Sequence, residues 1–112
     1  MSEKLQPTPR RVLIVEDSSD WRGHYEDAFS KANVDHVIVR NLEQAKEELE
    51  KGGFTEVITD GLGGKWEEVV GNAAGLPVRL VSSNLYLENQ AKLRGVGFSD
   101  KTDLDAWRKI AE

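Results

Sequence analysis

A chain of 112 residues has room for one compact domain with a hydrophobic core, and its 38% hydrophobic and 31% charged residues are ordinary for a globular protein. The net charge of −5 disfavours a nucleic-acid or acidic-membrane partner, and the absence of cysteine excludes disulfides, thiolate metal sites and cysteine nucleophiles. No apolar stretch approaches the roughly 18 residues of a membrane span. The polar start also has no signal-peptide core, so we expect a cytoplasmic protein.

Residues 1–10 are polar and contain two prolines, which predicts a flexible tail ahead of a single domain over residues 11–112. From residue 11 onward, short apolar runs alternate with segments in which apolar residues recur at helical spacing. The apolar runs predict strands at residues 11–15, 36–40, 57–59, 78–81 and, as a weaker edge strand, 96–99. The periodic segments predict helices at residues 21–32, 42–51, 66–73, 85–94 and 104–110. The three tryptophans fall on these helical stripes and are expected to be packing residues: Trp21, Trp66 and Trp107.

Polar residues mark where several of the helices begin. The first helix has three candidate capping residues at positions 18–20, and Asn41 can cap the second. Residues 102–105 (TDLD) have the form of a capping box, and they predict a last helix with Leu104, Trp107 and Ile110 facing inward. Five strand–helix repeats joined by short connections predict an α/β fold, a doubly wound five-stranded parallel sheet.

Chemically useful side chains follow the predicted strands. The first strand is followed by Glu16 and Asp17, the third by Asp60, the fourth by Ser82, and Lys101 comes just after the fifth. The carboxyl ends of parallel strands meet at one edge of the sheet, so these side chains are expected to gather in one pocket. Three carboxylates repel one another, and Mg²⁺ would relieve that repulsion. The pattern indicates phosphoryl transfer to a carboxylate, with an aspartate as the nucleophile.

These motifs together resemble the receiver domain of two-component response regulators, and the resemblance covers residues 11–112. The acidic pair lies in LIVEDS, the phosphoacceptor position is Asp60 in VITD, the switch hydroxyl is Ser82 in RLVSS, and the lysine is Lys101 in GFSDK. The resemblance implies a flavodoxin-like fold with strand order 2-1-3-4-5.

The resemblance also implies a magnesium site. Asp17 and Asp60 would bind Mg²⁺ directly, together with the backbone carbonyl of Leu62, and Glu16 would act through a metal-bound water. Lys101 would pair with Asp60 at rest and with the phosphoryl oxygens afterwards. The protein would then be a phosphoacceptor rather than an enzyme, with phosphorylation and dephosphorylation as its own reactions.

A switch and two kinds of partner follow from the same resemblance. Ser82 would move toward the phosphoryl group and let Phe98 turn inward, which alters the face made by the fourth helix, the fifth strand and the fifth helix. A histidine kinase or a phosphotransfer protein would donate the phosphoryl group. A downstream protein would dock on the altered face, because the output of a single-domain response regulator is binding.

Two departures from the family pattern leave other functions open. Residues 61–64 (GLGG) stand where the family has a Met-Pro pair, and Thr102 stands where a proline follows the lysine. One alternative is a receiver-like module that binds a partner without phosphorylation. A second is a small phosphatase or nucleotide-binding domain, since the glycine turn joins a strand to a helix as phosphate loops do. Asp60 could also be a turn residue, Ser82 a loop hydroxyl and Lys101 a solvated surface lysine.

Overall fold

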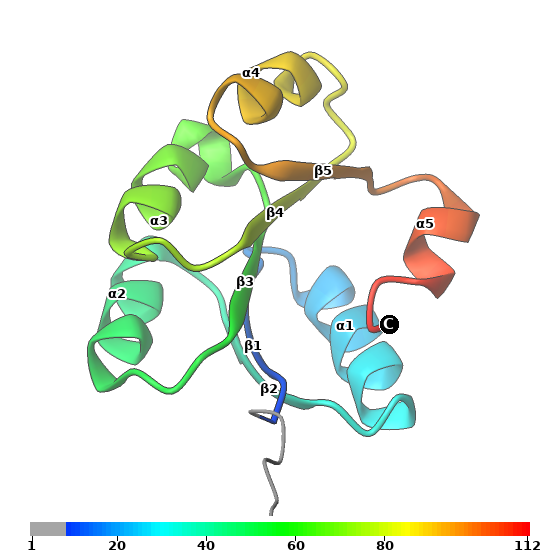
Figure 1. Ribbon diagram of the computed structural model, residues 1–112. Helices are drawn as coiled ribbons and strands as arrows, with labels where there is room; N and C mark the ends of the chain where they lie inside the picture. Colours follow the sequence, from blue (N-terminus) through cyan, green and yellow to red (C-terminus); the bar gives the residue numbers. More distant parts are fainter. Residues whose placement is uncertain (1–8) are drawn as a thin grey trace, which may run out of the picture.

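The structure is a computed structural model that describes residues 9–112, and a parallel sheet lies at its centre (Figure 1). Its strands are β1 (Arg11–Val15), β2 (Asp35–Val39), β3 (Glu56–Thr59), β4 (Val78–Ser82) and β5 (Gly97–Asp100). They lie in the order β2-β1-β3-β4-β5, which confirms the predicted doubly wound sheet and puts β5 at an edge. Residues 1–8 of the predicted tail lie outside the described residues, and the domain boundary at residue 11 stays a prediction.

Helices cover both faces of this sheet. They are α1 (Ser19–Lys31), α2 (Leu42–Lys51), α3 (Trp66–Asn72), α4 (Leu87–Leu93) and α5 (Leu104–Arg108), with a short 3₁₀ helix η1 (Leu62–Gly64) after β3. Residues of α1 and of the segment at and after α5 pack on one face, and residues of α2, α3 and α4 pack on the other (Figure 1). None of the described helices has the length and hydrophobicity needed to span a lipid bilayer.

The alternation of side chains along β1 explains why this strand is a continuous apolar run. Val12 and Ile14 pack on the side of α1, whereas Leu13 and Val15 pack on the side of α2. All four are fully buried, because successive side chains of a strand point to opposite faces and both faces of this sheet are covered. Such a strand is held firmly on both faces, so the backbone of residue 16, which follows it at the edge of the sheet, has a fixed position.

Of the three candidate caps of α1, Ser18 is the cap, and Asn41 caps α2 as predicted, but the capping box predicted for α5 was wrong. Asp103 caps α5, since its carboxylate accepts hydrogen bonds from the amides of Asp105 and Ala106. The hydroxyl of Thr102 donates instead to Asp100 Oδ1, at 2.8 Å. Thr102 is therefore engaged with the preceding strand and does not cap the helix.

Two further helical predictions are corrected. Leu104 was expected to face inward but is 73% exposed, while Ile110 is buried and Trp107 is half-buried. The reason is that α5 ends at Arg108, so Ile110 reaches the core from beyond the helix and the three residues form no single stripe. Helix α4 begins two residues later than predicted, because the Asn84 side chain accepts from the amide of Tyr86 and forms a turn there.

Candidate functional site

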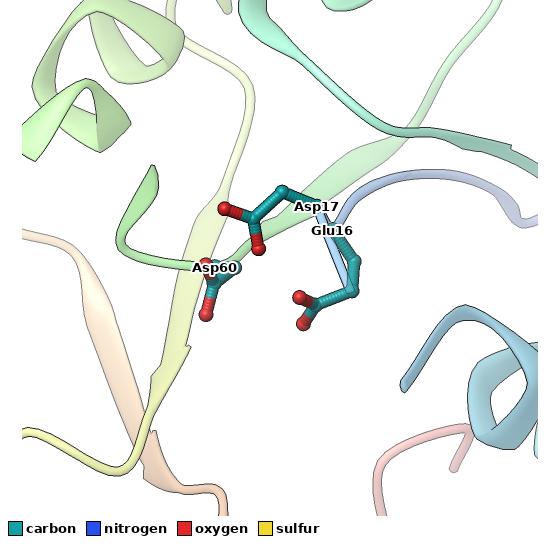
Figure 2. Close-up of side chains that lie close together, drawn as sticks. All are labelled: Glu16, Asp17 and Asp60. Carbon is teal, nitrogen blue, oxygen red and sulfur yellow. The ribbon is translucent and has the colours of Figure 1, made fainter. Parts of the chain in front are cut away.

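Three carboxylates lie together at the carboxyl edge of the sheet (Figure 2). Glu16 and Asp17 follow β1, and Asp60 follows the neighbouring β3, whose Thr59 is paired in register with Val15. The Asp60 amide donates to the Val15 carbonyl at 2.8 Å, which fixes the two strand ends side by side. One oxygen from each carboxylate lies within 4.8 Å of the others. The predicted acidic cluster is therefore present as a spatial group.

Lys101 reaches this cluster from the end of β5, on the far side of β4. Its amide donates to the Ser82 carbonyl at 3.0 Å, and this bond fixes the backbone beside β4. Its Nζ lies 2.9 Å from Asp60 Oδ1 and 2.7 Å from Glu16 Oε1. The side chain is only 8% exposed, so this is a buried ion-pair network and not a solvated surface lysine.

Burial and charge act against each other in this network. Glu16 is fully buried, and its pKa is raised mainly by that burial, although Lys101 and the Ser18 amide counteract it. Burial alone would lower the pKa of Lys101, but its contacts with Glu16 and Asp60 raise it above the ordinary value. Glu16 Oε1 receives no well-aligned hydrogen bond from the described residues, so its attraction to Lys101 is chiefly that of charge. Because its pKa is raised, the Lys101 ammonium stays protonated.

The glycine-rich turn after Asp60 folds back onto the carboxylate. The Leu62 amide donates to Asp60 Oδ2 at 3.1 Å. To make this turn Leu62 adopts a φ of 51°, and Gly63 and Gly64 follow with φ of 62° and 100°. These left-handed conformations are costly for most residues, which is a physical reason for two glycines here. The turn therefore orders the second oxygen of Asp60 while Lys101 holds the first.

The Leu62 carbonyl, a predicted metal ligand, accepts a hydrogen bond from the Lys65 amide at 3.2 Å. A carbonyl oxygen has two lone pairs, so this bond leaves it able to bind an ion as well. Its role as a ligand stays a prediction.

Ser82 lies at the end of β4 and is buried. A Cβ atom built on Gly61 would come within 3.9 Å of Ser82 Oγ, so the hydroxyl lies beside the residue that follows Asp60. Its Oγ accepts a hydrogen bond from the Asn84 amide at 3.0 Å. Phe98 is half-buried on β5, opposite Leu80, and packs against the core on the side of α2 and α3. Their roles as a switch pair stay predictions.

One contact of the site was missed in the sequence. The Trp21 ring lies over Lys101, with its centroid 4.9 Å from Nζ. Trp21 was predicted only to pack, because its helical stripe explained it. A usable signal existed: the Ser18 cap places the first turn of α1 directly after Glu16 and Asp17, and thus at the same edge of the sheet.

The donor atoms of this edge suit a hard divalent cation. Glu16, Asp17 and Asp60 offer carboxylate oxygens, which are the ligands that Mg²⁺ prefers, and Asp17 is exposed to solvent. Against these three negative groups stands the single ammonium of Lys101. This excess of negative charge favours the binding of a cation here.

Comparison with known proteins agrees with this architecture. No protein-family model and no curated protein matches the sequence. HP1043, an orphan response regulator of H. pylori, is similar with a TM-score of 0.75 and 16% identity, over 93% of this chain and 92% of that chain. The chemotaxis response regulator CheY4 of Vibrio cholerae is similar with a TM-score of 0.74 and 18% identity, over 92% and 96%. The receiver domain of Ssk1 from Saccharomyces cerevisiae gives 0.69 and 20%, over 93% and 87%. The chain therefore has the fold of response-regulator receiver domains.

Proposed function

We propose that the protein is a single-domain response regulator that accepts a phosphoryl group on Asp60. The observation that carries the proposal is the contact of Lys101 Nζ with Asp60 Oδ1 at 2.9 Å, beside the oxygens of Glu16 and Asp17. A lysine with a raised pKa remains charged and can bind phosphoryl oxygens as it now binds the carboxylate. The Asp60 side chain is 16% exposed, so a small donor group can approach it from solvent.

The transfer is a substitution at phosphorus. A carboxylate oxygen of Asp60 forms a bond to the phosphorus of a phosphohistidine, the nitrogen–phosphorus bond breaks, and the imidazole nitrogen leaves with the electron pair and later takes a proton. Lys101 holds the transferred oxygens, and the Leu62 amide orients the carboxylate. Mg²⁺ held by Asp17 and Asp60, with the Leu62 carbonyl and a water on Glu16, would neutralise the charge of the phosphoryl group.

The proposed donor is a histidine kinase or a phosphotransfer protein, in the cytoplasm. One structural neighbour supports this choice: the receiver domain of Ssk1 was crystallised with the histidine phosphotransfer protein Ypd1. The proposed output is docking of a protein on the face of α4, β5 and α5 after Ser82 and Phe98 rearrange. The role is that of a phosphoacceptor and not of an enzyme that turns over a substrate.

Acetyl phosphate tests the phosphoacceptor without knowledge of the kinase. The intact protein is incubated with acetyl phosphate and Mg²⁺, and mass spectrometry is expected to find one added phosphoryl group in the wild type and none in Asp60→Asn. Asp100→Asn is the matched control, because Asp100 lies next to Lys101 in the chain and its carboxylate accepts hydrogen bonds from Thr102. This control is expected to keep the label.

Two results would overturn the proposal: an unlabelled wild type, or equal labelling of Asp60→Asn and wild type. The first would favour the alternative in which the domain binds its partner without phosphorylation. Labelling of another residue would move the acceptor away from Asp60.

A further inference from the structure

We propose that Trp21 is a positioning residue, whose indole ring holds the Lys101 ammonium against Glu16 and Asp60. The proposal deepens the proposed function, since it rests on Lys101 acting at the phosphoacceptor. Neither the strand-end motifs nor the packing of α1 requires Trp21 to contact Lys101, so this role is an additional one.

The contacts of the ammonium give the first argument. A lysine ammonium has three N–H donors, and one of them bonds to Asp60 Oδ1 at 2.9 Å, while Glu16 Oε1 lies 2.7 Å away and attracts the ammonium by charge. The Trp21 ring lies 4.9 Å from the same nitrogen, well within the roughly 6 Å over which cation–π attraction acts. Because Lys101 is only 8% exposed, water can replace little of this contact.

Both the backbone and the ring of Trp21 have contacts that limit their positions. The Trp21 backbone amide donates to the Ser18 hydroxyl of the cap, which fixes the start of α1. The Trp107 ring of α5 meets the Trp21 ring edge-on, with 5.1 Å between the ring centroids. A ring fixed in this way can fix the ammonium in turn. The same turn of α1 also contributes Arg22, which donates to the Glu16 carbonyl at 3.1 Å.

The sequence after Lys101 gives the second argument. Thr102 follows it, and the local bonds of Thr102 go back to Asp100, through both its amide and its hydroxyl. These bonds fix the backbone of the turn but do not touch the long, flexible side chain of Lys101. Ordering such a side chain costs rotamer entropy, so a ring that limits its positions favours the one in which the ammonium contacts Asp60.

A double-mutant cycle tests this contact without any phosphoryl transfer. Trp21→Met removes the ring and keeps an apolar side chain, and Trp107→Leu is the matched control from the same aromatic cluster. Each is made in the wild type and in Lys101→Met, and urea unfolding is measured. The effect of Trp21→Met on the folding equilibrium is expected to shrink by about threefold or more in the Lys101→Met background. The effect of Trp107→Leu, which leaves the Trp21 ring in place, is expected to change less. Additive effects for Trp21 would overturn the proposal.

The rate of labelling by acetyl phosphate tests the consequence for the site. Trp21→Met is expected to react about threefold to tenfold more slowly than wild type, as loss of a cation–π contact of ordinary strength predicts. Trp21→Phe, which restores a ring, is expected to recover most of the rate. Trp107→Leu, which leaves the Trp21 ring in place but removes one of its contacts, is expected to slow labelling less than Trp21→Met does. Equal rates for Trp21→Met and Trp107→Leu would contradict the assignment.

The two experiments fail in different ways. If the wild type takes no label, the phosphoacceptor role of Asp60 is wrong, and the unfolding cycle still decides whether Trp21 holds Lys101. If the wild type is labelled and the cycle is additive, the positioning role of Trp21 is wrong and the proposed function stands.

Discussion

The two edges of the sheet carry charge in opposite ways. At the amino edge, two arginines each pair with one carboxylate: Arg10 with Glu56, and Arg11 with Asp35. All four side chains are partly exposed, from 29% for Glu56 to 67% for Asp35. At the carboxyl edge, three carboxylates share one ammonium, and Glu16 is completely buried. The two ion pairs of the amino edge are neutral and exposed to water, whereas the cluster at the carboxyl edge is net negative and partly buried.

Shape alone would point to the amino edge and away from the proposed site. A cleft of about 600 Å³ opens at the amino edge, lined in part by Arg10, Glu56 and Arg79. The carboxyl edge is distinguished instead by its charges, since three carboxylates stand against one ammonium. Burying charged groups costs free energy, and packing does not compensate for it. On the proposed function, the excess of negative charge at the carboxyl edge is a better sign of chemistry than the cleft, because a balanced exposed pair already has a structural explanation.

The largest expected effect is that of Lys101→Met on stability. Removing the ammonium leaves Glu16 buried without its counter-charge, and breaking a buried pair in this way costs about 3 kcal/mol. Since the folded-state pKa of Glu16 is already raised above 4.5, stability falls as the pH rises from there through the raised value. The loss is therefore expected to be larger at about pH 8 than at about pH 5, as measured by urea unfolding.

Glu16→Gln in the Lys101→Met background is the control for this effect. It removes the charge that was left behind, so the double variant is expected to be more stable than Lys101→Met alone. If the single variant unfolds at the wild-type urea concentration at both pH values, the carboxyl edge does not depend on its ammonium.

The second prediction concerns the excess negative charge of the carboxyl edge. Mg²⁺ at ten times its dissociation constant is expected to stabilise the wild type by about 1.4 kcal/mol, because it binds only the folded state. Asp17→Asn is expected to raise the stability without Mg²⁺, by reducing repulsion, and to lose most of the response to the ion. Differential scanning fluorimetry measures both, and equal melting temperatures with and without Mg²⁺ would count against a cation site.

Much of this architecture could be predicted because its signals are local. A strand buried on both faces is a continuous apolar run, and β1 was placed at residues 11–15 as found. Asn41 caps α2 through its own side chain, with no help from the rest of the fold. Since strand ends in a parallel sheet converge, the gathering of Glu16, Asp60 and Lys101 also followed from the pattern.

The missed features depend on competition between groups or on distant contacts. Thr102 and Asp103 were both able to cap α5, and the outcome was decided by Asp100, which engages the Thr102 hydroxyl. The contact of Trp21 with Lys101 joins the first helix to the end of the last strand. The spacing of apolar residues along α1 already explains Trp21 as a packing residue. The same spacing carries no information about residues far along the chain, so it could not reveal a contact with a cation.

The smallest expected effect belongs to the amino edge. The Arg10 Nε donates to Glu56 Oε1 at 2.8 Å, but the two side chains are 32% and 29% exposed, so water and salt screen their attraction. Glu56→Gln is expected to cost about 0.5–1 kcal/mol, less in high salt, and to leave the response to Mg²⁺ unchanged. Arg10 keeps its bond to the Ala111 carbonyl in this variant, so no charge is left buried. Urea unfolding at low and high salt measures the cost. A loss as large as that of Lys101→Met would show that burial and charge balance do not distinguish the two edges.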